Sequence, residues 1–189
     1  MKNCIIVHGS NSTKKGSEEG LPENERHWKP WLKKELEKKG IKVSNELYPK
    51  DWAPNYEDWK QVFEKNDIDR NTVLVGHSAG GAFLVRWLWE TKKNIEKLVL
   101  VSPGKAGRET RKKLSNLYGR NTYKNIKNYV RNGIIIFTSN DDIPVHIKNA
   151  YEYEKELPAK VIMLDGHGHY TLGDMGTEEL PELLEEALK

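Results

Sequence analysis

The chain has 189 residues, of which 37% are hydrophobic and 31% are charged, and its formal net charge is +3. This length suits one domain over residues 1–189. The mild charge does not favour nucleic acid as a partner, and the single cysteine, Cys4, excludes an internal disulfide. No apolar run comes near the about 20 residues that cross a bilayer, and the run after Lys2 is too short for a signal peptide. We therefore expect a cytoplasmic protein without a membrane-spanning segment.

Six short aliphatic or β-branched runs predict β-strands. They cover residues 3–7, 41–47, 72–76, 97–102, 133–138 and 159–164. Several are apolar throughout, which is typical of strands covered on both faces of a parallel sheet. Between them, hydrophobic side chains recur at helical spacing, for example after Trp28 and after Leu180, and Thr177 is the expected N-cap of the last helix. This alternation predicts a three-layer α/β/α sandwich whose ligand sites lie beyond the carboxyl ends of the strands.

Two long loops are predicted at that edge of the sheet. Residues 10–26 follow the first strand, and residues 104–132 follow the fourth. The second loop, here called the basic insert, has nine Lys or Arg residues and a single acidic residue, Glu109. The nine are Lys105, Arg108, Arg111, Lys112, Lys113, Arg120, Lys124, Lys127 and Arg131. A solvated helical face is the simpler interpretation of such a block, and an anion-binding surface is the alternative.

A nucleophile motif follows the third strand. Residues 76–80 read Gly-His-Ser-Ala-Gly, and a helical pattern begins directly after them. Small residues on both sides of Ser78 allow the sharp turn between strand and helix that lifts a serine hydroxyl above the sheet edge. The amide of Ala79 would then face a developing oxyanion at the start of the helix. We expect Ser78 to be a nucleophile and His77 to pack beside it.

A serine hydroxyl needs a histidine base and an acid that orients the base, in the order serine, acid, histidine along this topology. The fifth strand ends near Asp141 and Asp142, and the sixth ends near His167 and His169. All lie at the same predicted edge of the sheet. Side chains one or two positions apart point in different directions, so we expect only one of the two acids and one of the two histidines to act with Ser78. The residue pattern does not decide which acid or which histidine it is.

The same histidines also permit a metal site. Asp165, His167 and His169 form an Asp-x-His-x-His cluster that His8 could join. Short histidine spacings on glycine-rich turns often bind nothing, so we expect neither a metal nor any other cofactor.

These residues resemble the α/β-hydrolase superfamily and, more narrowly, the small serine hydrolases of the retinoblastoma-binding-protein-9 and YdeN type. The resemblance covers nearly the whole chain. It rests on His8-Gly9, on Trp28, Trp31 and Leu32, on the 76–80 motif, on residues 99–103, on Ser139 to Asp142 with Pro144 and Val145, and on Gly168-His169-Tyr170. No Leu-x-Cys-x-Glu motif is present, so retinoblastoma binding is not implied.

The resemblance selects between the open alternatives. In that family the acid lies three residues after the serine that closes the strand, which implies Asp142. The family histidine follows a glycine and precedes an aromatic residue, which implies His169. The loop after the first strand supplies the second oxyanion amide, implying Ser10 or Asn11. The implied sheet has six mainly parallel strands in the order 2-1-3-4-5-6.

The function expected from this pattern is hydrolysis of a small carboxylic ester, an amide or a thioester through an acyl-enzyme on Ser78, with no cofactor. Residues 48–59, rich in Trp, Tyr and Pro, are a candidate wall of the substrate pocket. The alternative is a hydrolase fold kept as a binding module, in which the basic insert binds an anionic partner. Between these two, the basic insert could be a lid that selects anionic substrates.

Overall fold

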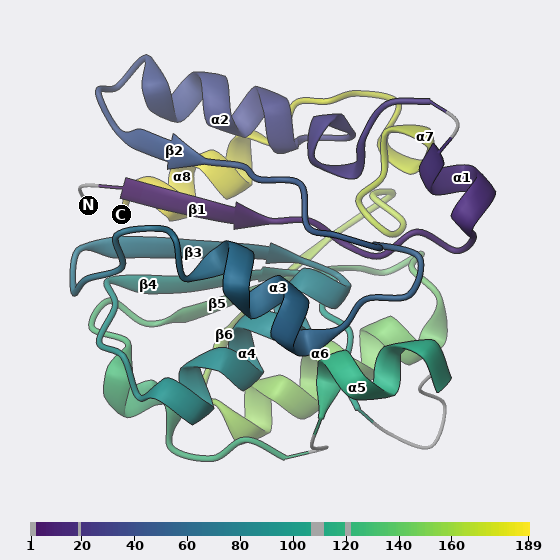
Figure 1. Ribbon diagram of the computed structural model, residues 1–189. Helices are drawn as coiled ribbons and strands as arrows, with labels where there is room; N and C mark the ends of the chain where they lie inside the picture. The colour runs from purple at the N-terminus through teal and green to yellow at the C-terminus, as the bar shows by residue number, and fades with distance from the viewer. Residues whose placement is uncertain (1–2, 19, 107–111, 120–121) are drawn as a thin grey trace.

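The computed structural model describes residues 3–18, 20–106, 112–119 and 122–189 (Figure 1). Its centre is a six-stranded sheet in the order β2-β1-β3-β4-β5-β6, and every neighbouring pair is parallel. The strands are β1 (Asn3–Val7), β2 (Lys42–Ser44), β3 (Thr72–His77), β4 (Lys97–Val101), β5 (Ile134–Ser139) and β6 (Lys160–Leu164). The strand order and the parallel pairing confirm the predicted sheet.

Helices cover both faces of this sheet, which confirms the three-layer sandwich (Figure 1). One face carries α2 (Lys29–Glu37) and α8 (Pro181–Leu188), and the other carries α3 (Tyr56–Phe63), α4 (Ala79–Thr91) and α6 (Pro144–Glu156). Shorter helices are α1 (Lys14–Glu18), α5 (Ser115–Tyr118) and α7 (Leu172–Met175), with 3-10 turns at Glu23–Glu25, Lys112–Leu114 and Ile126–Tyr129. Within the described ranges, no helix combines the length and the apolar character needed to cross a membrane.

Both faces of the central strands are buried. Along β3, Val73 and Val75 pack with Trp28 under α2, whereas Leu74 packs with Phe83 under α4. Successive strand residues point to opposite faces, so both sides of β3 need apolar side chains. Each buried side chain of this kind contributes about 1.5–3 kcal/mol. Polar groups are therefore confined to the ends of the central strands, where the candidate site lies.

Two predicted boundaries are wrong. β2 is an edge strand of three residues rather than 41–47, because the chain leaves the sheet after Ser44 and the Asn45 side chain bonds to the Asn24 carbonyl instead (2.7 Å). Thr177 does not cap the last helix; its hydroxyl accepts a bond from the Glu179 amide in a turn ahead of that helix (3.1 Å). The helix begins at Pro181, because a proline disfavours the helical conformation in the residue before it.

The basic insert packs against the layer that contains α3, α4 and α6. Its apolar residues Leu117 and Ile126 are buried in the core on this face of the sheet. Lys105 is also buried, and its Nζ lies 3.0 Å from Glu156 Oε2 and 3.9 Å from Glu152 Oε2. The interpretation of the insert as a solvated face is therefore wrong for Lys105. Three of the nine basic residues fall outside the described part of the chain: Arg108, Arg111 and Arg120.

Candidate active site

Ser78 lies in the turn between β3 and α4 with a strained backbone. Its φ of 50° and ψ of −115° are rare for a residue with a side chain. The turn is closed by glycines on both sides: a Cβ on Gly76 would lie 2.7 Å from the Gly81 Cα, and one on Gly80 would lie 2.4 Å from the carbonyl oxygens of Val7 and His8. The end of β1 thus packs directly on this turn, and only glycine fits at position 80.

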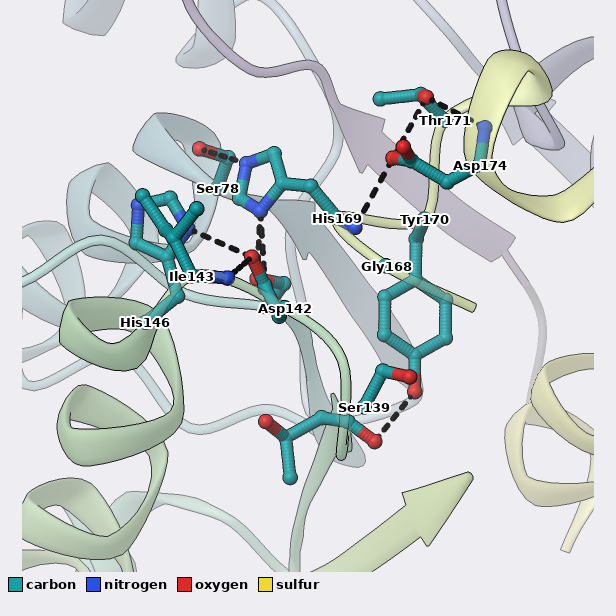
Figure 2. A network of polar contacts seen from close by, with 12 residues as sticks. Ser78, Ser139, Asp142, Ile143, His146, Gly168, His169, Tyr170, Thr171 and Asp174 are labelled. Atoms are coloured by element: carbon teal, nitrogen blue, oxygen red, sulfur yellow. Dashed lines mark hydrogen bonds and ion pairs between the residues drawn. The ribbon is translucent and has the colours of Figure 1, made fainter. Parts of the chain in front are cut away.

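His169 lies between Ser78 and Asp142 (Figure 2). The distance from His169 Nε2 to Ser78 Oγ is 3.0 Å, and that from His169 Nδ1 to Asp142 Oδ2 is 3.1 Å. A carboxylate only accepts hydrogen bonds, so Nδ1 carries the proton and Nε2 presents a lone pair to the serine hydroxyl. The structure therefore brings together the three side chains that the resemblance implied, from the ends of β3, β5 and β6.

Asp142 is held in its charged form. Its side chain is only 1% exposed, and burial alone would raise its pKa. Hydrogen bonds from His146 and His169, the positive charge that His169 can carry, and a bond from Ser102 outweigh burial and hold the pKa of Asp142 well below its usual range. The carboxylate can therefore stabilise a positive charge on His169.

The alternative acid and histidine lie elsewhere. Asp141 accepts a bond from the Gly168 amide (2.9 Å) and supports the loop that carries His169, rather than the imidazole itself. The His167 ring pairs with the Asp165 carbonyl through Nδ1 (2.8 Å).

Three contacts fix the loop around His169. The His169 amide donates to Asp174 Oδ2 (3.0 Å), and Asp174 is in turn held by the Thr171 hydroxyl (2.7 Å) (Figure 2). Tyr170 is fully buried and its hydroxyl donates to the Thr138 carbonyl (2.7 Å). The His169 imidazole therefore projects from a loop that is anchored on both sides of it.

Two polar residues at the site were given no role by the sequence analysis. Ser102, directly after β4, has a φ of 42°; its hydroxyl donates to Asp142 Oδ2 and lies 2.8 Å from His169 Nδ1. His146, in the first turn of α6, lies with Nδ1 3.2 Å from Asp142 Oδ1 and stacks on His169. A signal existed for His146, because it lies four residues after Asp142 next to a helix start at Pro144.

His77 lies under the His169 loop, as expected for a packing residue. Its Nε2 donates to the His169 carbonyl (2.9 Å), and its ring lies 5.1 Å from the His169 ring. Burial, together with nearby positive charge from His169 and Lys29, holds the pKa of His77 well below its ordinary value. His77 is therefore a neutral support.

His8 is not free to join the alternative metal cluster of Asp165, His167 and His169. Both ring nitrogens of His8 are engaged, Nδ1 with the Gly9 carbonyl (2.7 Å) and Nε2 with the Tyr48 amide (2.8 Å). Donor atoms of Asp142, His146 and His169 do lie within 4.8 Å of one another. The two imidazoles are stacked at 26°, so no single position lies in both ring planes at the about 2 Å that a zinc ion requires. As arranged, this donor set does not fit tetrahedral zinc.

The main-chain amides expected to hold an oxyanion come from Ala79 and the loop after β1. Ala79 is the first residue of α4, where amides have no partner within the helix. The Asn11 amide already donates to the Asp51 carbonyl (3.1 Å). Ser10 lines the same cleft as Ser78, so of the two candidates in this loop Ser10 is the better placed.

The cleft above Ser78 has a volume of about 950 Å³. Its walls come from the basic insert, with Lys105 and Tyr118, and from α6, with His146 and Glu152. The prediction that residues 48–59 form a wall is wrong. Their aromatic side chains are buried in the core on the α4 face, because Tyr48, Tyr56 and Trp59 pack around Phe83.

The fold and the turn around Ser78 define an α/β hydrolase. The YdeN protein of B. subtilis has a structure of TM-score 0.82 at 24% identity, over 100% of this chain and 97% of that one. A putative YdeN-like hydrolase of Pectobacterium atrosepticum has a TM-score of 0.65 at 12% identity, over 98% and 89%. Est1E of Butyrivibrio proteoclasticus, solved with ferulic acid, has a TM-score of 0.62 at 14% identity, over 99% and 86%.

The chain belongs to the serine hydrolase family, because the family model of that description matches residues 16–186. This match covers most of the chain and includes Ser78, Asp142 and His169, whereas Ser10 lies before it. A comparison with curated proteins gave no match.

Proposed function

We propose that this serine hydrolase cleaves small carboxylic esters through a triad of Ser78, His169 and Asp142. The observation that carries the proposal is the continuous chain of hydrogen bonds from Ser78 Oγ through the His169 ring to the Asp142 carboxylate. Family membership supports hydrolysis of a small molecule. The choice of an ester as the bond that is cleaved is supported by the open cleft above Ser78 and by the chemistry of a hydroxyl nucleophile.

In the proposed first half-reaction, His169 Nε2 takes the proton from Ser78 Oγ as the oxygen attacks the ester carbonyl carbon. The negative charge that develops on the carbonyl oxygen is held by the Ala79 and Ser10 amides, of which one donor is typically worth about 3 kcal/mol. Asp142 stabilises the imidazolium. His169 then gives the proton to the leaving alcohol, which departs and leaves Ser78 acylated.

In the proposed second half-reaction, His169 removes a proton from a water molecule that attacks the acyl-enzyme. The same amides hold the second oxyanion, and the proton returns from His169 to Ser78 Oγ as the acid product leaves. The chemistry uses only side chains and main-chain amides of this chain, so it requires no cofactor.

The alternative role of the basic insert as an anion-binding module is not favoured. Lys105, a basic residue of the insert that lines the cleft, is paired with Glu156 and Glu152. The insert instead shapes the wall of the cleft beside Ser78.

The decisive experiment is covalent labelling. We expect a fluorophosphonate probe to modify Ser78 in the folded wild type, as located by mass spectrometry, and p-nitrophenyl esters of short acids to be hydrolysed. Ser78→Ala is expected to lose both properties while keeping the wild-type unfolding temperature. Matched amide and thioester substrates then define the bond. Ester hydrolysis that persists in Ser78→Ala, or labelling at another residue, would overturn the proposal.

A further inference from the structure

The Asp142 carboxylate binds two imidazoles rather than one. Oδ1 accepts bonds from the Ile143 amide (2.7 Å) and His146 Nδ1 (3.2 Å), while Oδ2 accepts from Ser102 and from His169 Nδ1. The His146 ring also lies face to face with the His169 ring, with centroids 4.2 Å apart. Figure 2 shows both rings on the same carboxylate. His146 thus contacts both the acid and the base of the proposed triad.

We propose that His146 is a positioning residue of the active site, which moderates the charge of Asp142 by hydrogen bonding and fixes the His169 ring by stacking. This inference rests on the proposed function, because it assigns His146 an effect on the acid and base of that reaction. His146 has two effects, one through its N–H donor and one through the face of its ring, and different substitutions remove each of them.

The donor acts through the acid. An N–H bond to Oδ1 draws negative charge away from the side of the carboxylate that faces His169, so Asp142 stabilises the imidazolium less strongly. Loss of this donor leaves a more basic carboxylate. That carboxylate stabilises the imidazolium more strongly, and the pH at which activity is half lost on the acid side rises.

The ring face acts through geometry. His169 is 27% exposed at its side chain, and its ring lies 4.2 Å from the His146 ring and 5.1 Å from the His77 ring. Stacking restricts rotation of the His169 ring away from Ser78 Oγ, and a small misplacement of a catalytic group lowers the rate markedly.

Two other imidazoles near His169 have lowered pKa values, and a nearby carboxylate bonds to the main chain. His77, from β3, is buried with its pKa held well below the ordinary value, and burial together with the charges of Lys29 and Arg26 lowers the pKa of His27 to about 3. The Asp174 carboxylate, from α7, is bonded to the His169 main-chain amide rather than to its ring. An acid-side shift that depends on residue 146 therefore reports the Asp142–His169 pair.

Three substitutions separate the two contributions. His146→Phe keeps an aromatic face and removes the donor. His146→Asn keeps an N–H donor, because its amide nitrogen is as many bonds from Cα as Nδ1, and removes the face. His146→Ala removes both. The control is Tyr151→Ala, an exposed residue of the same helix that does not line the cleft.

The readouts are kcat, KM and the acid limb of kcat/KM for a p-nitrophenyl ester, with unfolding temperatures. We expect kcat of His146→Ala to fall about tenfold with KM within about twofold, as for a group that acts on the transition state. The acid limb should move up by about half a pH unit in the Phe and Ala variants, since hydrogen bonds to charged groups shift titrations on this scale, and it should return to the wild-type position in His146→Asn.

The outcomes distinguish this inference from the proposed function. Wild-type protein that is labelled at Ser78, together with His146 variants that match Tyr151→Ala in kcat and acid limb, would overturn the role of His146 alone. An acid limb that moves equally in the Phe and Asn variants would also overturn it, since packing would then explain the effect. Folded wild type that is neither labelled nor active refutes the proposed function and this inference with it. If His146→Ala fails to fold, the Phe and Asn pair still decides.

Discussion

Replacement of Asp142 by Asn is the sharpest test of the candidate triad. The carboxylate receives four donors, two on each oxygen. An asparagine has one acceptor oxygen, and in place of the second carboxylate oxygen it has an NH2 group, which would face two of these donors. If the oxygen stays with the Ile143 amide, the amide group faces His169 Nδ1 and favours the tautomer with the proton on Nε2. That tautomer cannot take the proton of Ser78, and the imidazolium also loses its counter-charge at 3.1 Å.

The expected loss in kcat is about 10⁴-fold, the size seen when the acid of a serine triad becomes an amide, which corresponds to about 5.5 kcal/mol of barrier. The assay is hydrolysis of a p-nitrophenyl ester with the rate of fluorophosphonate labelling. Asp141→Asn is the matched control, because this neighbour bonds to the Gly168 amide and not to the ring. We expect it to lose less than about tenfold, as for an indirect support. The reasoning is refuted if Asp142→Asn keeps a tenth of the activity or if Asp141→Asn is the more damaging change.

Three further outcomes are expected. Gly80→Ala should lower the free energy of unfolding, measured by urea denaturation, by about 3 kcal/mol or more, because the added Cβ would lie 2.4 Å from two carbonyl oxygens. The control Gly173→Ala should be near neutral, since the nearest atom to its added Cβ would be 3.7 Å away. Equal effects of the two substitutions would contradict the close packing at Gly80. Burial lowers the pKa of His8 to about 4, so as the pH falls the unfolded chain takes up this proton first. His8 should therefore contribute a loss of about 1.4 kcal/mol per pH unit in the free energy of unfolding between about pH 6.5 and 4, beside the losses from His27 and His77; a slope that stays the same in His8→Asn would count against it. If the basic insert selects anionic substrates, an anionic ester should be cleaved faster than a neutral one at low salt only, and equal rates throughout would exclude a charge-selecting lid.

The central strands could be predicted from sequence because burial on both faces leaves little choice of residue. Val73, Leu74 and Val75 are all buried, and an apolar run bounded by polar residues marks such a strand. β2 is an edge strand with partly exposed residues, so its length depended on contacts of Asn45 with a distant loop, which no local pattern contains. The start of α8 shows the opposite case: Pro181 was visible in the sequence and outweighs the capping preference of Thr177.

Some side chains of the site could likewise be predicted from local sequence, and others could not. Ser78 and His169 lie in motifs whose glycines are required by local geometry, so the sequence indicates them directly. Ser102 and His146 reach Asp142 only because β4 and α6 end and begin beside it, and serine or histidine at such places has many uses. The aromatic residues of 48–59 were instead assigned to the site wrongly. Aromatic residues are typical of both a pocket wall and a core, and here they pack with Phe83 in the core.

The walls of the cleft and its floor come from different parts of the chain. The floor is set at the ends of the strands, where the close fit of Gly80 against β1 leaves no room for change. The walls belong to the basic insert and to α6, which border the cleft from outside the sheet. A lineage carrying this fold can therefore acquire new substrates through replacements in the walls alone. Laboratory evolution aimed at a new specificity should concentrate its libraries there and leave the turn around Ser78 untouched.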